Sequence, residues 1–218
     1  MKKSAVLVTL LFVAGCSGGG GTVNVGGASP TVAPTLTAPG STSPNSGPVA
    51  TPGAGQSAVP AEKNPPGDIP DNVAYVAYTN AAGKYTFTHP EGWSETTTGS
   101  TVTYTDKLNG VQVLLGKLTT APTVDSAKQR DVPALRSSQA AFELRNVTAA
   151  TVPGGTGVRI VYRRNSAPDP VTGRQYRDEV ERYELVSDGR EVIVELFGPV
   201  GSDNVDAYKT MITSLKLS

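Results

Sequence analysis

The composition of the chain changes sharply at about residue 68, and this change limits which part can fold. Residues 17–67 are mainly Gly, Ser, Thr, Ala and Pro, contain no aromatic residue, and carry only two charged side chains, Glu62 and Lys63. Such a stretch buries too little apolar surface to offset the entropy lost on ordering. The composition predicts a disordered tether, most simply a passive spacer, and a folded part confined to residues 68–218.

The foldable part, residues 68–218, has the size of one ordinary domain. Three lysines and one glutamate precede it, which leaves 16 basic and 18 acidic residues and a net charge near −2. This balance gives no long-range attraction to nucleic acid or to an anionic membrane surface, so neither is an expected partner of the domain. The one cysteine, Cys16, lies outside the domain, so packing without an internal disulfide must hold the core.

The beginning of the chain has the pattern of an export signal. Two lysines precede an apolar run over residues 5–13, which is too short to span a bilayer as a mature helix, and Ala14 and Gly15 are the small residues that a cleavage site needs. Residues 1–15 are therefore predicted to be a signal peptide. One alternative is a plain secretory peptide in which a cysteine falls near the cut by coincidence.

The quartet Val13-Ala14-Gly15-Cys16 resembles the lipobox of bacterial lipoproteins. The resemblance implies that the signal peptidase recognises Val13, Ala14 and Gly15, that the Cys16 thiol is alkylated with diacylglycerol, and that Cys16 becomes the mature N-terminus. Two or three acyl chains hold a protein firmly to a bilayer. We therefore expect residues 16–67 to be a lipidated N-terminus and tether. The domain would face the extracytoplasmic side of the cell membrane.

The first half of the domain has the pattern of short strands. Residues 85–89 alternate in polarity up to Pro90, Pro90-Glu91-Gly92 turns the chain, and two further strands are predicted over 93–97 and 101–105. Asn109-Gly110 is a typical hairpin turn. The segment after it, 111–118, is apolar on both sides for part of its length, which predicts a central strand covered on two faces.

A helical segment then interrupts the strands. Thr123 can cap a first turn over 124–126, and Pro133 is well placed as the first residue of a second helix that runs to Ala141. Further strands are predicted over 142–152, 157–165, 175–187 and 190–197. Asp188-Gly189 is predicted to be the turn between the last two of these strands.

A final helix is expected after residue 201. Ser202 or Asp203 can cap it, and apolar side chains recur at helical spacing in Val205, Tyr208, Met211, Ile212 and Leu215. The order of strands, helix, strands and helix predicts an α+β fold with a mainly antiparallel sheet and helices on both faces.

In order and spacing, these segments resemble the PsbP-like family, which comprises the extrinsic photosystem II protein and its bacterial lipoprotein relatives. The resemblance covers about residues 72–217. It rests on six segments in order: an aromatic segment (75–78), a Gly-aromatic-x-Phe strand (83–87), a Pro-x-x-Trp turn (90–93), a Tyr-x-Asp stretch (104–106), a strand with its hairpin (175–189) and an apolar helix (205–215). It implies an α/β/α sandwich with a mainly antiparallel central sheet.

The same resemblance implies a membrane protein complex as partner and suggests calcium as a cofactor. In a photosynthetic host it also implies an association with the oxygen-evolving complex of photosystem II. The chain departs from the family in two respects. It lacks the N-terminal segment through which the plant protein engages its photosystem, and its one histidine cannot supply the metal-binding histidines of some relatives.

No catalytic set is evident in the sequence, and we predict no catalytic residues. His89 is the one histidine, and neither a Gly-x-Ser-x-Gly elbow nor a His-Glu-x-x-His motif occurs. A lone histidine before a proline is more often a packed turn residue than a catalytic base. Trp93, after a turn, is more often a core residue than an anchor for a partner. His89 and Trp93 are nevertheless the candidates for contact with a partner.

Acidic residues supply weak candidates for a metal site. The predicted strand 175–187 carries four acidic and two basic side chains, which favours a solvated, ion-paired face over a calcium site: Asp178, Glu179, Glu181, Glu184, Arg177 and Arg182. Calcium takes oxygen ligands that converge from loops. Asp169 and Asp188, in or near loops, are therefore the metal candidates.

Three hypotheses follow for the function. The first is a lipid-anchored, non-enzymatic scaffold or assembly-factor domain that binds a membrane protein complex. The second is a binding module for calcium or a small ligand, with a pocket between sheet and helix. The third, a hydrolase with an unfamiliar site, has little support in the sequence.

Overall fold

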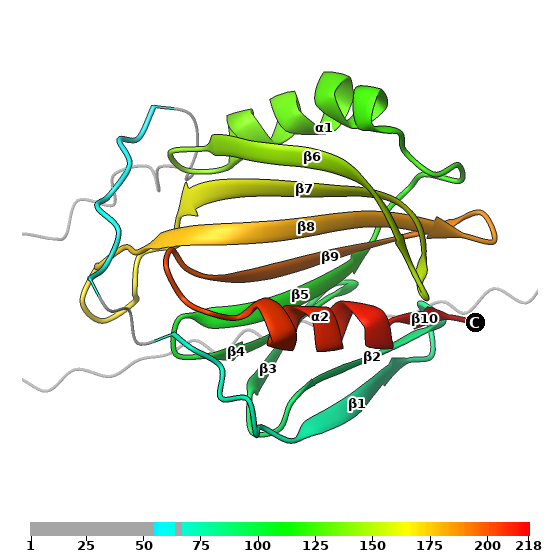
Figure 1. The fold of residues 1–218 in the computed structure, drawn as a ribbon, viewed down its shortest axis with the longest axis horizontal. Helices are drawn as coiled ribbons and strands as arrows, with labels where there is room; N and C mark the ends of the chain where they lie inside the picture. The colour runs from blue at the N-terminus through cyan, green and yellow to red at the C-terminus, as the bar shows by residue number, and fades with distance from the viewer. Residues whose placement is uncertain (1–54, 64–66) are drawn as a thin grey trace, which may run out of the picture. The chain divides into compact units, whose positions relative to one another are not determined.

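The computed structural model describes residues 55–63 and 67–218. Val13, Ala14, Gly15, Cys16 and most of the expected tether lie outside these ranges. The described elements, in chain order (Figure 1), are β1 (Tyr75–Asn80), β2 (Tyr85–Pro90), β3 (Ser94–Thr98), β4 (Thr101–Asp106), β5 (Asn109–Leu115), α1 (Val124–Ser138), β6 (Glu143–Val152), β7 (Gly155–Asn165), β8 (Arg177–Ser187), β9 (Arg190–Pro199), α2 (Val205–Ser214) and β10 (Lys216–Leu217).

A seven-stranded sheet in the order β3-β4-β5-β9-β8-β7-β6 forms the centre of the domain (Figure 1). All its pairings are antiparallel, which confirms the predicted character of the sheet. Two meanders, β3 to β5 and β6 to β9, are joined where β5 pairs with β9 and Val113 lies opposite Val194. β5 is therefore a central strand, as its apolar sequence predicts.

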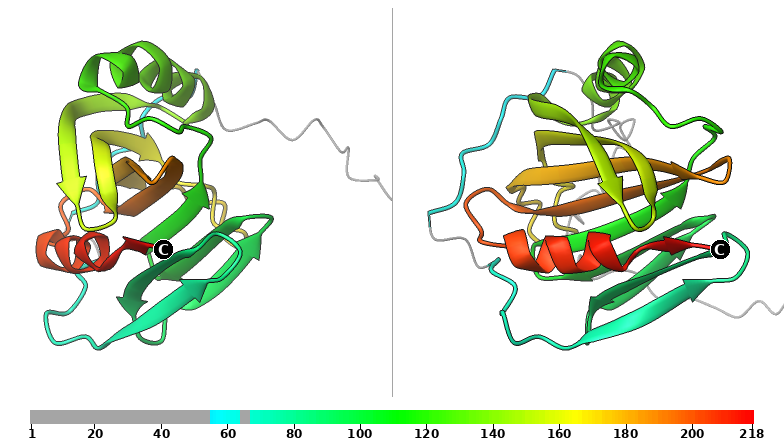
Figure 2. Two further views of the ribbon diagram at one scale, coloured as in Figure 1. Left: turned by 90° about the vertical axis from the view of Figure 1, so that its right-hand side faces the viewer. Right: turned by 45° about the vertical axis from the view of Figure 1, so that its right-hand side comes forward.

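A second sheet, in the order β1-β2-β10, was not predicted as a separate unit. It forms because the alternating strand β2 directs Tyr85 and Phe87 into the core, while the short strand β10 pairs along the other edge of β2. Figure 2 shows α2 lying along β2, and α1 packed over β6, away from α2.

Two hydrophobic clusters result, one associated with each helix. The larger contains residues of α2, the small sheet and β4, β5 and β9, among them Tyr85, Leu196 and Met211. The smaller contains residues of α1, β6, β7 and β8, such as Leu135 and Ile160. Helices therefore contribute to two separate parts of the core, and the small sheet shares its part with α2.

The segment from 124 to 138 is one helix, so the prediction of a turn followed by a separate helix from Pro133 to Ala141 is wrong. Thr123 caps the helix with a capping box: its Oγ1 accepts from the backbone N–H of Ser126 (3.2 Å), and Ser126 Oγ accepts from that of Thr123 (2.9 Å). Pro133 lies on the exposed side inside the helix. It removes one backbone donor without ending the helix.

The hairpin between β4 and β5 is present, but its turn residues are Lys107 and Leu108 rather than Asn109-Gly110. Asn109 instead opens β5, opposite Asp106, and its buried side chain makes two hydrogen bonds in the fold, described below. The β8–β9 turn is Asp188-Gly189, as predicted, with φ of 49° and 69°. Those angles are the ones a two-residue hairpin turn requires.

α2 begins after Asn204 rather than after a capping Ser202 or Asp203, and Asn204 makes no side-chain cap. Its side chain is used in the core instead. Asn204 Oδ1 accepts from the backbone N–H of Ile69 (2.8 Å), and Nδ2 donates to Asn109 Oδ1 (2.9 Å), while Asn109 Nδ2 donates to the carbonyl of Gly67 (2.6 Å). This buried cluster ties the start of the domain to β5 and α2.

The described end of the expected tether, residues 55–63, lies in contact with the domain. Asn165 Nδ2 donates to the carbonyl of Ser57 (2.8 Å), and its Oδ1 accepts from the backbone N–H of Val59 (3.0 Å). Arg174 forms an ion pair with Glu62 at 2.6 Å.

Within residues 55–63 and 67–218, no helix is long and apolar enough to span a membrane.

Candidate functional site

His89 is packed inside the domain rather than presented to a partner. Its side chain is 6% exposed, its ring stacks on that of Tyr104 with centroids 3.5 Å apart, and its Nδ1 lies 2.9 Å from the carbonyl oxygen of Pro90. Burial lowers the pKa of His89, so the ring is neutral at neutral pH. These contacts match the packed turn residue that the sequence favours.

Trp93 is half-buried and lines a cavity of about 230 Å³ between the β2–β3 and β4–β5 turns. A second cavity, of about 370 Å³, shares Ile69 and Pro70 with the first and extends to the start of α2. Six exposed carboxylates line the two cavities, and Lys107 is the one basic residue among the lining residues. We call this region the acidic end: Asp68, Asp71, Glu91, Asp106, Asp203 and Asp206.

The metal candidates Asp169 and Asp188 lie at opposite ends of β8 and do not share a site. Asp169 organises its own loop, because its Oδ1 accepts from the backbone N–H groups of Val171 (3.0 Å) and Thr172 (2.7 Å), and these hydrogen bonds lower its pKa. Asp188 occupies the β8–β9 turn. Within residues 55–63 and 67–218, no three His, Cys, Asp or Glu side chains are grouped as a metal ion would require.

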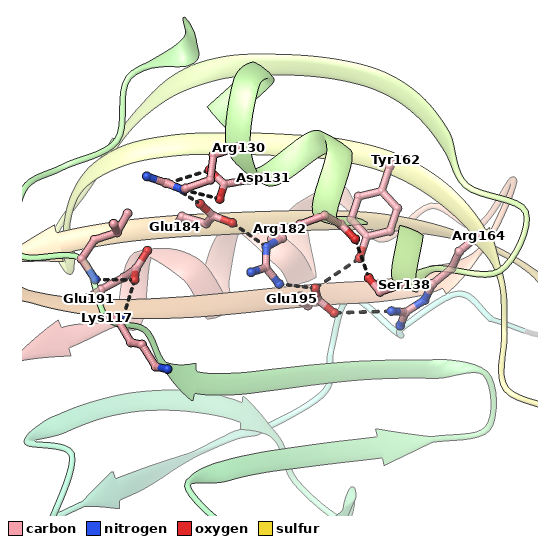
Figure 3. A network of polar contacts seen from close by, with 12 residues as sticks. Lys117, Arg130, Asp131, Ser138, Tyr162, Arg164, Arg182, Glu184, Glu191 and Glu195 are labelled. Atoms are coloured by element: carbon pink, nitrogen blue, oxygen red, sulfur yellow. Dashed lines mark hydrogen bonds and ion pairs between the residues drawn. The ribbon is translucent and has the colours of Figure 1, made fainter. Parts of the chain in front are cut away.

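A charged network crosses β7, β8 and β9 beside α1 (Figure 3). At its centre, Glu195 accepts hydrogen bonds from Arg182 Nη1 (2.6 Å), Arg164 Nη1 (3.4 Å) and Tyr162 Oη (3.2 Å). Arg182 Nε also donates to Glu184 Oε1 at 2.7 Å. Sequence reasoning missed this network because Glu195 lies on the neighbouring strand, in register with Arg182.

Residues of α1 extend this network to the helix. Arg130 Nη2 lies 2.7 Å from Asp131 Oδ2 and 3.9 Å from Glu184 Oε2 (Figure 3). Glu184 is 2% exposed and Asp178 3%, so the prediction of a solvated face is wrong for these two acids, although ion pairing is confirmed. The reason is that α1 and the neighbouring strands cover this part of β8.

The pKa values of the acids in this network shift in opposite directions. Burial raises the pKa of Glu184 to about 7, against the attraction of Arg182, and that of Asp178 to about 7, against Arg164 and Arg177. Burial also opposes ionisation of Glu195, but Arg164 and Arg182 outweigh it and lower the pKa. Perturbed carboxyls are a feature of many functional sites. Here arginines bond to Glu195 and to Oε1 of Glu184, whereas Glu184 Oε2 is buried without a hydrogen-bond partner within the described residues. The network connects three strands and a helix.

These features define an α+β domain with an antiparallel central sheet, and no family model and no curated protein matches it. Among solved structures the fold is similar to that of cyanobacterial PsbP from Synechocystis sp. PCC 6803, with a TM-score of 0.46 and 16% identity. The similarity covers 67% of this chain and 94% of that chain. A PsbP protein, from the family that the sequence resembles, is therefore among the solved structures of similar fold.

Two other solved structures are similar at a comparable level. The Saccharomyces cerevisiae Ran-binding protein Mog1p has a TM-score of 0.42 and 10% identity, over 67% of this chain and 96% of that chain. A protein from Bacteroides thetaiotaomicron VPI-5482 has a TM-score of 0.41 and 11% identity, over 65% of this chain and 48% of that chain. These likenesses concern the fold alone.

Proposed function

We propose that this protein is a non-enzymatic binding or scaffold protein that docks on a membrane protein complex through its acidic end. It is held by lipid at Cys16 on the extracytoplasmic side of the cell membrane. The main support for this docking surface is that six exposed carboxylates and a half-buried tryptophan surround two adjoining cavities. The partner surface is correspondingly basic.

The acidic end differs from the surface of β7 and β8 in how its charges are compensated. On β7 and β8, acids are matched by arginines, as in the pairs Arg159–Glu181 and Arg163–Glu179. Within the described part of the chain, none of the six carboxylates of the acidic end forms an ion pair. Uncompensated charge of one sign attracts and orients a partner of the opposite sign.

Trp93 gives the same surface an apolar component. Tryptophan is enriched among the residues that contribute most to binding, especially where a large ring sits in a pocket surrounded by polar groups. Trp93 packs against the core cluster on one side and lines the 230 Å³ cavity on the other. A basic side chain from a partner can contact the ring face as well as the carboxylates around it.

The docking surface is tested by neutralising three acids that have no side-chain hydrogen bond within the described residues. The variant Asp71→Asn/Glu91→Gln/Asp106→Asn should recover at least tenfold less partner than the wild type in pull-downs from detergent-solubilised membranes. The control Asp125→Asn/Asp188→Asn removes two exposed acids elsewhere and should recover the wild-type amount. Equal recovery by the two variants would exclude the acidic end as the docking surface.

The same three-site variant separates docking from the calcium alternative. Calorimetric titration of the wild-type chain with Ca²⁺ should give no saturable heat under the proposal. A saturable response that the three-site variant loses, together with no partner in the pull-down, would favour the calcium-binding module.

The membrane anchor is tested through Cys16. Cys16→Ser should move the protein from the membrane fraction to the soluble fraction and abolish its labelling by fatty-acid analogues. Retention in the membrane with unchanged labelling would show that the lipoprotein interpretation is wrong.

A further inference from the structure

A third cavity lies at the opposite end of β9 from the acidic end, and three turns form it. It has a volume of about 290 Å³ and is lined by residues 82–84 between β1 and β2, 115–119 after β5, and 189–191 at the β8–β9 turn. Three basic residues line it, against one carboxylate, that of Glu191. We call it the basic pocket, after Lys84, Lys117 and Arg190.

The one carboxylate of the basic pocket is already engaged by the backbone. Glu191 is 5% exposed, and its Oε2 accepts from the backbone N–H groups of Lys117 (2.7 Å) and Leu118 (2.9 Å). A Cβ at Gly116 would overlap this carboxylate, so glycine is what allows the close approach. Glu191 therefore fixes the wall that carries Lys117 through its Oε2 atom, and its one negative charge is outnumbered by three basic residues in the lining.

Arg190 has an unused donor in this region. Its Nη2 donates to the backbone oxygen of Ser218 (2.6 Å), whereas its Nη1 is buried and has no partner within the described residues. A buried donor that lacks an acceptor is unfavourable. Because Nη1 is closed off from solvent, a ligand in the pocket reaches it only when the Arg190 side chain shifts.

We propose that the basic pocket binds a phosphate group. One arginine and two lysines line the cavity, and this set matches the charge and the several acceptor oxygens of phosphate. The volume lies at the lower end of the range for ligand pockets, so the ligand is small or is one group of a larger molecule. Leu115 and Leu118 give the lining an apolar part. A water-soluble phosphate ester and a phospholipid head group share this chemistry.

The test compares two double variants that remove the same charges. Lys84 and Lys107 both lie in hairpin turns with φ of 51°, at opposite ends of the domain. The pocket variant is Lys84→Asn/Lys117→Gln, and the control is Lys107→Asn/Lys209→Gln, which changes exposed lysines away from the pocket. All measurements use the full chain with Cys16→Ser, so that no acyl chain of its own inserts into vesicles.

Two kinds of probe distinguish the sources of the phosphate. Calorimetry at constant ionic strength follows titration with inorganic phosphate and with glycerol 3-phosphate, and flotation follows binding to phosphatidylglycerol vesicles, with phosphatidylcholine vesicles for comparison. We expect saturable binding to at least one phosphate probe, weakened at least about tenfold in the pocket variant and unchanged in the control.

The outcomes assign the ligand or overturn the proposal. Saturable glycerol 3-phosphate binding without flotation assigns a soluble ester. Flotation with phosphatidylglycerol that the pocket variant loses assigns a phospholipid head group. The absence of saturable binding to every probe, or equal affinity in the two double variants, overturns the proposal. Either of these two results would leave the proposed docking surface unaffected, because that surface lies at the other end of the domain and is tested separately.

Discussion

Among the charged residues, Glu195 has a large predicted effect on stability because it is buried between two arginines. It is 4% exposed and accepts from Arg182, Arg164 and Tyr162. Glu195→Gln removes the negative charge that Arg182 and Arg164 share, and we expect the free energy of unfolding to fall by about 3 kcal/mol. Denaturant unfolding measures this fall.

The control for Glu195 is an ion pair on the surface. Arg145 pairs with Glu143 at 2.8 Å, but the two side chains are 47% and 44% exposed. Arg145→Gln should therefore change the free energy of unfolding by less than about 1 kcal/mol. Similar effects of the two substitutions would contradict the structural role of the charged network.

Asp178 gives the stability of the domain a definite pH dependence. Burial raises its pKa from 3.8 to about 7, with Arg164 and Arg177 opposing. Because the folded state keeps a proton that the unfolded state has released, the stabilisation is complete below about pH 4 and is lost as the pH rises through about 7. One such proton changes the free energy of unfolding by at most about 1.4 kcal/mol per pH unit.

Asp178→Asn should flatten this dependence, because the amide does not ionise. Denaturant unfolding at pH 5 and pH 8 should show a smaller loss of stability for Asp178→Asn than for the wild type. Asp125→Asn, at an exposed site of α1, should keep the wild-type difference. A loss in Asp178→Asn as large as in the wild type would show that another group carries the pH dependence.

For single residues, the predictions from sequence were correct where neighbouring residues in the chain determine the local structure. Asp188-Gly189 forms its predicted turn and Thr123 its predicted cap, because both depend on the backbone of neighbouring residues. Asn109 and Glu184 were wrongly interpreted. Their positions are decided by Asn204 and Arg182 together with the cover of α1, and a single sequence contains no measure of such distant contacts.

At the scale of elements, the pairing of β7 with β8 depends on a glycine. A Cβ at Gly157 would overlap the backbone carbonyl oxygen of Glu184 on the neighbouring strand. Backbone inside a sheet cannot move away as a side chain can, so Gly157→Ala should lower the free energy of unfolding by about 3 kcal/mol or more. Thermal and denaturant unfolding test this.

Gly110 provides the comparison for Gly157. A Cβ there would meet the ring of Phe197, a side chain that can rotate, so Gly110→Ala should be milder, at about 1 to 3 kcal/mol. An equal or larger effect of Gly110→Ala would show that the sheet near β7 is more adaptable than the register suggests.

At the scale of the whole molecule, the boundary between tether and domain lies earlier than the composition indicates. Asn165 is 4% exposed and bonds to Ser57 and Val59. Deleting residues 17–54 should leave the unfolding midpoint unchanged, whereas deleting 17–63 should lower the free energy of unfolding by about 1 to 3 kcal/mol, because a buried amide loses partners. Equal stability of the two deletions, measured by thermal unfolding, would show that the segment 55–63 contributes nothing.

The class of fold could be predicted for the whole molecule, but the distribution of its charged ends could not. Alternation and turns identify the strands, and their order predicts an antiparallel α+β domain. The acidic end and the basic pocket each combine turns that are far apart in sequence, such as residues 82–84 with 189–191. Composition gives only the sum of the charges, which is near zero. It does not show that acidic and basic side chains gather at opposite ends of the domain.

The pairing of β5 with β9 also determines the order in which the chain can fold. The two strands meet across about 80 residues, so their contact closes a long loop and forms slowly. The β6–β9 meander has local pairings and can form first, as a template for β5. β2 must in turn wait for β10, near the end of the chain. A polypeptide that emerges N-terminus first would therefore expose its early strands until the last residues arrive, which makes this interval the most vulnerable to aggregation and proteolysis.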